Sequence, residues 1–237
     1  MKNWQISMIN KIQAVKCEQS LLKTISLLSK DLGFDYCAYG IRSPLPLSNP
    51  KTITINNYCV AWQEKYKING YLEIDPTVQH ALYSSQPIRW TDQLFSSACN
   101  LMEDARSFGL HHGIAFPIHD PSGFTGMLTL SRSHELINEA EFYEKILKLS
   151  WLTQVIHIEM TKYLVPKLIP EAKIKLSKRE TEVLQWTADG KTSWEISYIL
   201  NIAERTVNFH INNCVAKLKV CNKTSATIKA LTLGLLQ

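Results

Sequence analysis

The hydrophobic residues near the C-terminus recur with the period of a helix. Val207, Ile211, Cys214 and Leu218 are separated by four, three and four positions, with mostly polar residues between them. This spacing predicts a helix over residues 204–219 that has one buried face. The other face carries amide, hydroxyl and basic side chains: Arg205, Thr206, Asn208, His210, Asn212, Asn213 and Lys217.

Two shorter helices are expected directly before this one, and each begins with a capping box. Ser177 with Glu180, and Thr192 with Glu195, have the spacing at which a hydroxyl and a carboxylate satisfy each other's backbone amides. Gly190 ends the first helix, because glycine readily adopts a left-handed conformation. The second helix is expected to point three apolar side chains inward: Ile196, Ile199 and Leu200. Proteins that read the DNA major groove use short capped helices followed by a helix with a polar outer face, and this pattern therefore predicts a helix-turn-helix.

The first 165 residues mix helical periods with alternating, strand-like patterns. Helices are expected over residues 4–15, 18–32, 61–68, 75–84 and 100–108, and strands over 36–42, 52–56, 87–90, 114–119 and 125–131. The turn Asp120-Pro121-Ser122-Gly123 predicts that the last two strands form an antiparallel hairpin. Helices before, between and after the strands predict an α+β protein whose N-terminal part is an α/β/α sandwich around an antiparallel sheet.

A domain boundary follows a long periodic helix over residues 135–164. Pro166 and Pro170 are expected to stop this helix, because proline lacks the amide donor and restricts the preceding residue. The sequence therefore predicts a domain at 1–165, a linker at 166–175 and an all-α domain at 176–237. A last helix over residues 224–235 carries Ala226, Leu231 and Leu235, which are candidates for pairing with a second copy.

The charge is distributed unevenly between the two predicted domains. Residues 1–165 hold 15 Lys+Arg and 15 Asp+Glu, which leaves 11 and 6 for the rest of the chain, so the whole net charge of +5 lies there. A neutral domain joined to a basic one indicates a regulatory domain followed by a domain that binds a polyanion such as a nucleic acid.

The remaining composition excludes several classes of protein. The six cysteines form no CxxC pair, so we expect free thiols in a reducing cytoplasm. No apolar run has the length of a membrane span, and no signal-peptide core stands at the N-terminus. No nucleophile elbow, phosphate-binding glycine loop or HExxH motif is present, and His111-His112 have no third ligand at metal-binding spacing. We therefore expect neither an enzyme nor a metal or cofactor site.

Both halves resemble the LuxR family of quorum-sensing transcription factors. In the C-terminal half the resemblance rests on Glu182, Leu184, Gly190, Lys191, Thr192, Glu195, Ile196, Thr206, Val207, His210, Asn213, Lys217, Leu218 and Gly234. In the N-terminal half it rests on Trp62, Tyr66, Asp75, Pro76, Trp90 and Gly113. Tyr58 stands at a further position where the family contacts the head group of its ligand. The spacing is most similar to that of the QscR-like orphan receptors. The resemblance implies an acyl-homoserine-lactone-binding domain followed by a LuxR-type helix-turn-helix domain.

The chemistry of the implied ligand fits these residues. The indole N–H of Trp62 suits the lactone carbonyl, the carboxylate of Asp75 suits the amide N–H, and Tyr58 can donate to the amide carbonyl. Thr129 is a further candidate for that carbonyl or for a 3-oxo group. The apolar wall is expected from Tyr66, Val78, Leu82, Trp90, Leu101, Ala105, Leu110 and Leu128. A few placed polar groups in an apolar cavity are typical of a small-molecule site.

The resemblance also implies a homodimer that binds an inverted-repeat operator on double-stranded DNA. Arg205, Asn208 and Asn212 are the expected base readers, and Lys191, Thr206, His210, Asn213 and Lys217 the expected phosphate or packing contacts. Ala203 stands where the family frequently has a Ser helix cap.

Three other classes of protein are alternatives to this interpretation. The same fold could bind a different small signal, which the Trp62 and Asp75 pair disfavours. A phosphorylation-driven response regulator would need an N-terminal acidic pair and a phosphoacceptor Asp after a strand, whereas this chain begins with helices. An enzyme that makes or degrades the lactone would turn the ligand over instead of retaining it.

Overall fold

A computed structural model describes residues 2–236, without the side chains of residues 2, 3, 172 and 173. The chain divides into two compact units. The first comprises residues 1–42, 51–120 and 124–164, and the second comprises residues 43–50, 121–123 and 165–237. We retain the sequence-based limits 1–165, 166–175 and 176–237 as proposed domain boundaries.

The first unit is built on a five-stranded antiparallel sheet with the order β2-β1-β5-β4-β3. Its strands are β1 (Tyr36–Arg42), β2 (Thr52–Asn56), β3 (Ile88–Arg89), β4 (His112–His119) and β5 (Thr125–Arg132). The predicted hairpin is confirmed, since β4 and β5 pair across the turn at residues 120–123. The predicted strand over residues 87–90 shortens to the two residues of β3, which lies at one edge of the sheet.

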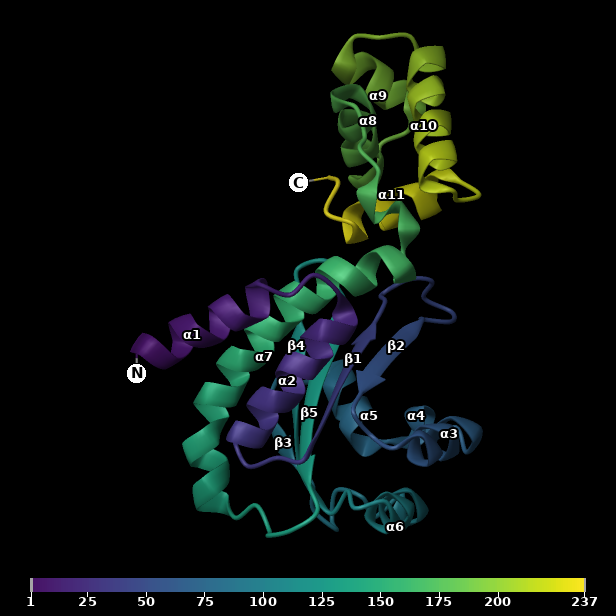
Figure 1. Cartoon of the computed structure of the whole chain (residues 1–237). Coiled ribbons are helices and arrows are strands. Elements are labelled where there is room, and N and C mark those ends of the chain that lie inside the picture. Colours follow the sequence, from purple (N-terminus) through teal and green to yellow (C-terminus); the bar gives the residue numbers. More distant parts are fainter. Residues whose placement is uncertain (1, 237) are drawn as a thin grey trace. The chain divides into compact units, whose positions relative to one another are not determined.

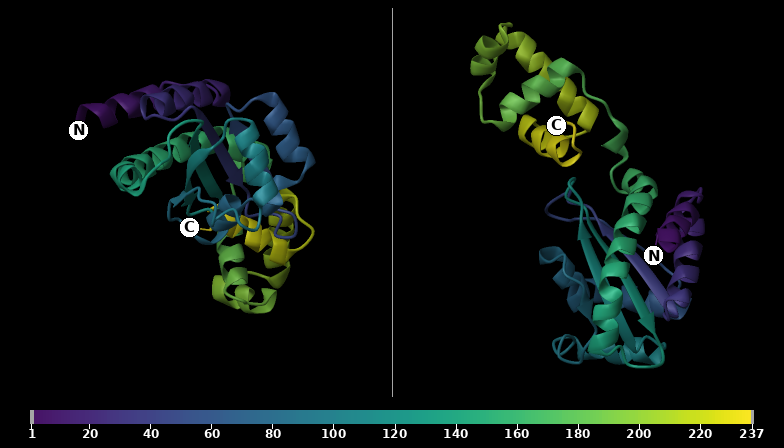
Figure 2. Two further views of the ribbon diagram at one scale, coloured as in Figure 1. Left: turned by 90° about the horizontal axis from the view of Figure 1, so that it is seen from below. Right: turned by 90° about the vertical axis from the view of Figure 1, so that its left-hand side faces the viewer.

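Helices cover both faces of this sheet (Figures 1 and 2). On one face lie α2 (Glu18–Asp31) and the long α7 (Glu139–Leu168), with α1 (Lys2–Gln13) beside them. On the other face lie α3 (Val60–Ile68), α4 (Tyr71–Ile74), α5 (Pro76–Tyr83) and α6 (Cys99–Ser107). The predicted α/β/α sandwich is therefore confirmed, and α4 is an element that sequence reasoning missed.

The ends of α7 differ from the prediction. The helix begins at Glu139 because Glu135 has a positive φ of 51° and the Asn138 side chain accepts the Glu141 amide at 2.9 Å. It continues through Pro166 to Leu168, so the expectation that this proline stops the helix is wrong. Pro166 lies in the last turn, and only two helical residues follow it, so the amide donor that it lacks would have served only the end of the helix. A short 3-10 helix, η1 (Pro170–Lys173), then occupies part of the predicted linker.

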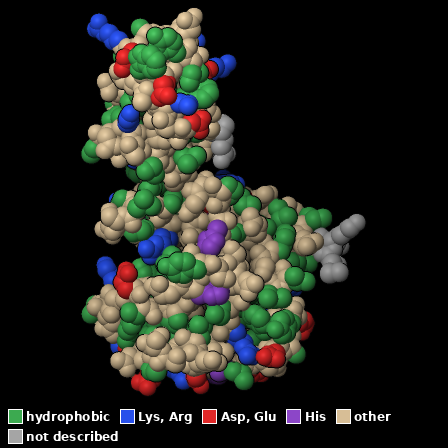
Figure 3. Space-filling view, turned by 180° about the vertical axis from the view of Figure 1, so that it is seen from behind, with side chains coloured by type: hydrophobic (Ala, Val, Ile, Leu, Met, Phe, Trp, Pro, Cys, Tyr) green, Lys and Arg blue, Asp and Glu red, His purple; other side chains and the backbone are tan. Residues whose placement is uncertain are grey.

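The second unit contains the four expected helices: α8 (Lys178–Ala188), α9 (Ser193–Leu200), α10 (Glu204–Leu218) and α11 (Lys223–Thr232). Both capping boxes form, and Gly190 has a φ of 83° after α8. Ala203, the N-cap of α10, makes no side-chain cap bond. Ile196 is buried, but Ile199 is 45% exposed, so its predicted inward position is wrong. Hydrophobic side chains also reach the surface elsewhere in this unit (Figure 3).

No helix within residues 2–236 is long and apolar enough to cross a membrane.

Candidate ligand cavity and DNA-binding helix

A cavity of about 720 Å³ lies between the sheet and the layer of α3, α4, α5 and α6. The structure brings eleven of the twelve ligand residues predicted from the sequence to the wall of this one cavity. They are Tyr58, Trp62, Tyr66, Asp75, Val78, Leu82, Trp90, Leu101, Ala105, Leu110 and Thr129. They come from separate strands, helices and connecting segments, so their convergence requires the whole fold of the first unit.

The floor of the cavity consists of alternate residues from three neighbouring strands. Pairing across β2, β1 and β5 sets them in three rows: Asn56–Ala38–Thr129, Thr54–Gly40–Met127 and Thr52–Arg42–Thr125. Successive strand residues point to opposite faces. Leu128, between two of these positions, is fully buried and does not line the cavity, so its predicted place in the wall is wrong.

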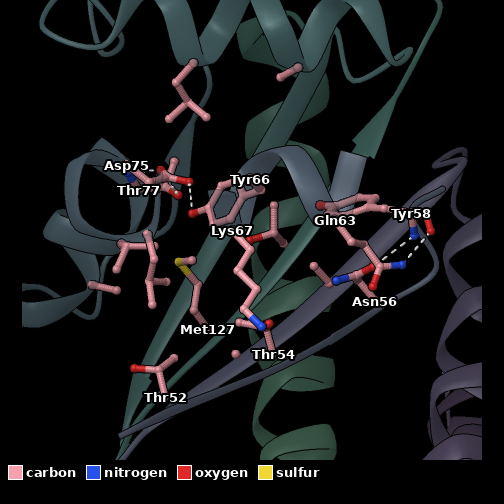
Figure 4. Close-up of a pocket in the computed structure, with 18 of the residues that line it drawn as sticks. Thr52, Thr54, Asn56, Tyr58, Gln63, Tyr66, Lys67, Asp75, Thr77 and Met127 are labelled. Atoms are coloured by element: carbon pink, nitrogen blue, oxygen red, sulfur yellow. Dashed lines mark hydrogen bonds between the residues drawn. The ribbon is translucent and has the colours of Figure 1, made fainter. Parts of the chain in front are cut away.

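Asp75 has two roles, because it is the N-cap of α5 and also lines the cavity. Its Oδ1 accepts the Thr77 amide at 2.8 Å and the Thr77 hydroxyl at 2.7 Å, while its Oδ2 accepts the Tyr66 hydroxyl at 2.9 Å (Figure 4). Burial raises the pKa of the Asp75 carboxyl, although the hydrogen bonds from Thr77 oppose this shift. Burial also raises the pKa of Tyr66 well above its ordinary value, so its phenol stays a donor.

Aromatic rings close one end of the cavity. The Trp62 ring is 4% exposed and lies 5.6 Å from the Tyr66 ring and 5.6 Å from the Phe108 ring, centroid to centroid. Trp90 packs on Gly113, where an added Cβ atom would lie only 2.6 Å from the indole ring. The Trp90 indole Nε1 is buried and has no hydrogen-bond partner among the described residues. An acceptor brought by a ligand would satisfy this donor.

The segment before α3 holds Tyr58 at the cavity wall. The Tyr58 amide donates to Asn56 Oδ1 at 3.1 Å, and Gln63 Nε2 donates to the Tyr58 carbonyl at 2.8 Å (Figure 4). Burial raises the pKa of the Tyr58 phenol, which therefore remains protonated at neutral pH and can donate.

Sequence reasoning missed the polar residues that line the cavity between the edge strand β2 and α3. Thr52, Thr54 and Asn56 come from β2, and Gln63 and Lys67 from α3. Figure 4 shows the Lys67 side chain extended toward Thr54. The alternation of Thr and Ile in β2 was the available signal, because it puts all three β2 residues on one face.

A second group that sequence reasoning missed connects three of the four helices in the wall, α3, α4 and α6. Asp104 on α6 accepts from Lys65 Nζ on α3 at 2.7 Å and from the Tyr71 hydroxyl on α4 at 2.6 Å. Hydrogen bonds from Lys65 and Tyr71 lower the pKa of the Asp104 carboxyl below its ordinary value. These contacts hold α6, which carries Leu101 and Ala105, against the neighbouring helices.

The predicted DNA-binding residues lie on α10, except for Lys191, which precedes the N-cap of α9. Arg205, Asn208 and Asn212 are exposed, Lys217 is exposed but paired, and Lys191, Thr206, His210 and Asn213 are partly buried. The Asn208 Oδ1 accepts the Ser193 hydroxyl at 2.7 Å, so its amide nitrogen is the freer end of that side chain.

Lys217 has a structural partner that sequence reasoning did not foresee. Its Nζ lies 2.6 Å from Oε2 of Glu180, whose side chain is only 5% exposed. The same oxygen accepts the Ser177 amide at 2.7 Å in the capping box of α8. Lys217 therefore neutralises a nearly buried carboxylate, and its substitution would perturb the fold as well as any contact with phosphate.

Comparison with known proteins agrees with this architecture. A model described as an autoinducer binding domain matches residues 18–160, and one described as bacterial regulatory proteins of the luxR family matches residues 175–230. The chain is 43% identical to the transcriptional activator protein AnoR of Acinetobacter nosocomialis over all of both chains. It is 36% identical to the quorum-sensing regulator RhlR of Pseudomonas aeruginosa over 98% of this chain and 96% of that protein.

A solved structure agrees over both halves. The crystal structure of Escherichia coli SdiA superposes with a TM-score of 0.89 at 33% identity, covering 99% of this chain and 98% of that one. The proteins of this family are regulators of transcription and not enzymes. The chain accordingly belongs to the LuxR family, with an autoinducer-binding domain followed by a helix-turn-helix DNA-binding domain.

Proposed function

We propose that this regulator binds an N-acyl-homoserine lactone in the cavity of its first unit and an inverted-repeat operator as a homodimer. The convergence of eleven of the twelve predicted ligand residues on one cavity is the observation that carries the proposal. The ligand offers a lactone carbonyl, an amide N–H and an amide carbonyl, and the wall offers matching groups.

The head group has partners of the right polarity at the aromatic end. The indole groups of Trp62 and Trp90 are donors without acceptor capacity, which suits a lactone carbonyl. The free lone pairs of Asp75 suit the amide N–H, and Tyr58 or Thr129 suits the amide carbonyl. The acyl chain would then lie over Met127 and against Val78.

Ligand binding would favour the folded first unit by mass action, because a filled cavity adds contacts that the unfolded chain lacks. A dimer would present two α10 helices to half-sites about 10 base pairs apart. Leu231 on α11 is 59% exposed and is a candidate dimer contact. Ala226 is fully buried within its own domain and therefore has no part in the proposed pairing.

The direct test compares two Trp→Phe variants of the full chain with respect to ligand affinity. Trp62→Phe removes one neutral hydrogen-bond donor, so affinity for a matching lactone should fall by about two- to tenfold. Trp151→Phe is the matched control, because Trp151 lies on α7 against Trp4 and not on the cavity wall. Equal affinity of both variants and the unaltered protein would contradict the assigned head-group site.

A fatty-acyl glycerol is a second candidate ligand. One SdiA structure, 33% identical to this chain with a TM-score of 0.88, is described as a complex with octanoyl-rac-glycerol. Mass spectrometry of ligand extracted from protein made with either compound in the medium separates the candidates. Retention of the intact lactone in competition with the acyl glycerol supports the proposal, whereas exclusive retention of the glycerol ester refutes it.

A further inference from the structure

Phe209 occupies an unusual place on α10. The helix buries Val207, Ile211, Cys214 and Leu218 against the rest of its domain, yet Phe209 is 59% exposed. At 3.6 residues per turn, Phe209 lies about 190° around the helix axis from the middle of that buried face. A large aromatic side chain thus stands at the centre of the outward face of the recognition helix.

Polar residues surround Phe209 on this face. Arg205 lies one turn before it, and Asn212 and Asn213 lie one turn after it, at positions that neighbour it on a helix surface. Arg205 and Asn212 are exposed, and the adjacent His210 ring lies 5.6 Å from the Phe209 ring, centroid to centroid. The face therefore presents hydrogen-bonding groups around one apolar group.

The partner that fits this face is the major groove of DNA. Residues 166–237 carry 11 Lys+Arg against 6 Asp+Glu, which favours a polyanion over another apolar protein surface. The base edges in the major groove offer hydrogen-bond donors and acceptors and one apolar group, the C5-methyl of thymine. An aromatic side chain flanked by an arginine and amides matches this combination.

We propose that Phe209 reads the C5-methyl group of one thymine in each half-site of the operator. This inference rests on the proposed docking of α10 in the major groove and adds to it a residue that selects a base by apolar contact. Arg205 and Asn212 would bond to the base edges on either side. The contact distinguishes thymine from uracil, which pairs identically but lacks the methyl group.

The test measures binding of the full, ligand-loaded chain to an operator selected from a randomised DNA pool. Each thymine is then replaced by deoxyuridine, which removes only the methyl group. Binding of the unaltered protein should fall about fourfold at one thymine per half-site, as expected for one buried methyl group. Phe209→Ala should bind the original operator more weakly and should be indifferent to that replacement.

The matched control is Ile199→Ala, because Ile199 is 45% exposed on α9 and lies off the recognition helix. This variant should keep the full response to deoxyuridine. If the unaltered protein ignores every deoxyuridine, or if Phe209→Ala responds as strongly as the unaltered protein, the inference is refuted. Unchanged DNA binding by Phe209→Ala with reduced transcription in vitro would also refute it and assign the ring to a protein partner. Failure to recover any operator would instead refute the proposed function.

Discussion

Replacing Asp75 by asparagine separates the two roles of this side chain. One carboxylate oxygen caps α5 through Thr77, and the other accepts from Tyr66 and faces the cavity. Asparagine keeps an oxygen for the cap and is as good an N-cap as aspartate. Its amide nitrogen then replaces the oxygen on the cavity side, where it would oppose the N–H of the ligand.

The expected loss follows from the charge of the missing acceptor. A hydrogen bond to a charged group contributes about 1.5–3 kcal/mol, so lactone affinity should fall by about tenfold to 150-fold. The free energy of unfolding without ligand should change little in Asp75→Asn. Asp75→Ala removes the cap as well and should lower that free energy by about 1 kcal/mol.

Calorimetric titration with one lactone, combined with urea unfolding of the ligand-free protein, measures both quantities on the same samples. Asp75→Asn should be defective in ligand binding only, and Asp75→Ala in both binding and stability. A well-folded Asp75→Asn protein with unaltered affinity would refute the assignment of this carboxylate to the amide N–H. A stability loss in Asp75→Asn as large as that in Asp75→Ala would show that the cap geometry is wrong.

Three further outcomes are expected. Gly113→Ala places a methyl group against the Trp90 indole and should lower the free energy of unfolding in urea by about 1–3 kcal/mol. Gly40→Ala is the control, because its added methyl group would make only ordinary contacts and should cause no such loss. Equal losses in the two variants would contradict the close packing of Gly113 on Trp90. Burial alone would raise the pKa of the Glu141 carboxyl. Hydrogen bonds from Arg132 and Lys145 outweigh this effect, so the net pKa lies below the ordinary value. Its stabilisation is therefore present above the ordinary glutamate pKa of about 4.3 and is lost as the pH falls below that value, so Glu141→Gln should flatten the acid limb of a stability profile. Finally, the melting temperature should rise with a matching lactone and vary with acyl-chain length, and a flat response across the series would exclude ligand-coupled stability.

Local signals in the sequence predicted most of the fold. The two capping boxes need only residues three positions apart, so the starts of α8 and α9 were predicted to the residue. Thr and Ile alternate along β2, and the predicted limits of β1 and β2 are those of the structure. Gly33 and Gly109 adopt positive φ values where helices were expected to end.

The errors come from features that depend on neighbours distant in the sequence. Ile199 has the spacing of a core residue, but no element covers it fully. Leu128 was predicted to line the cavity because it is apolar, although strand alternation points it toward the opposite helices. Pro166 is compatible with the last turn of α7, which the presence of a proline alone does not reveal.

The candidate site was predicted in composition but not in full extent. The predicted ligand residues followed from the family resemblance and from the chemistry of a lactone amide. The alternation along β2 puts Thr52, Thr54 and Asn56 on one face, but whether that face lines the cavity depends on the pairing of β1 with β2, which the sequence does not display. Phe209 was not singled out from the sequence, although the helical period already places it opposite the predicted buried face of α10, and its exposure agrees with that position.

The three rows of the cavity floor have a consequence for how such receptors diverge. Asp75 both starts a helix and lines the cavity, so selection for a new signal meets a folding constraint at that position. Floor residues such as Thr54 and Met127 project from strands whose pairing uses only backbone groups. Substitutions there leave the strand pairing in place, so under the proposed function gene duplicates would acquire preferences for different acyl chains through single changes on the floor.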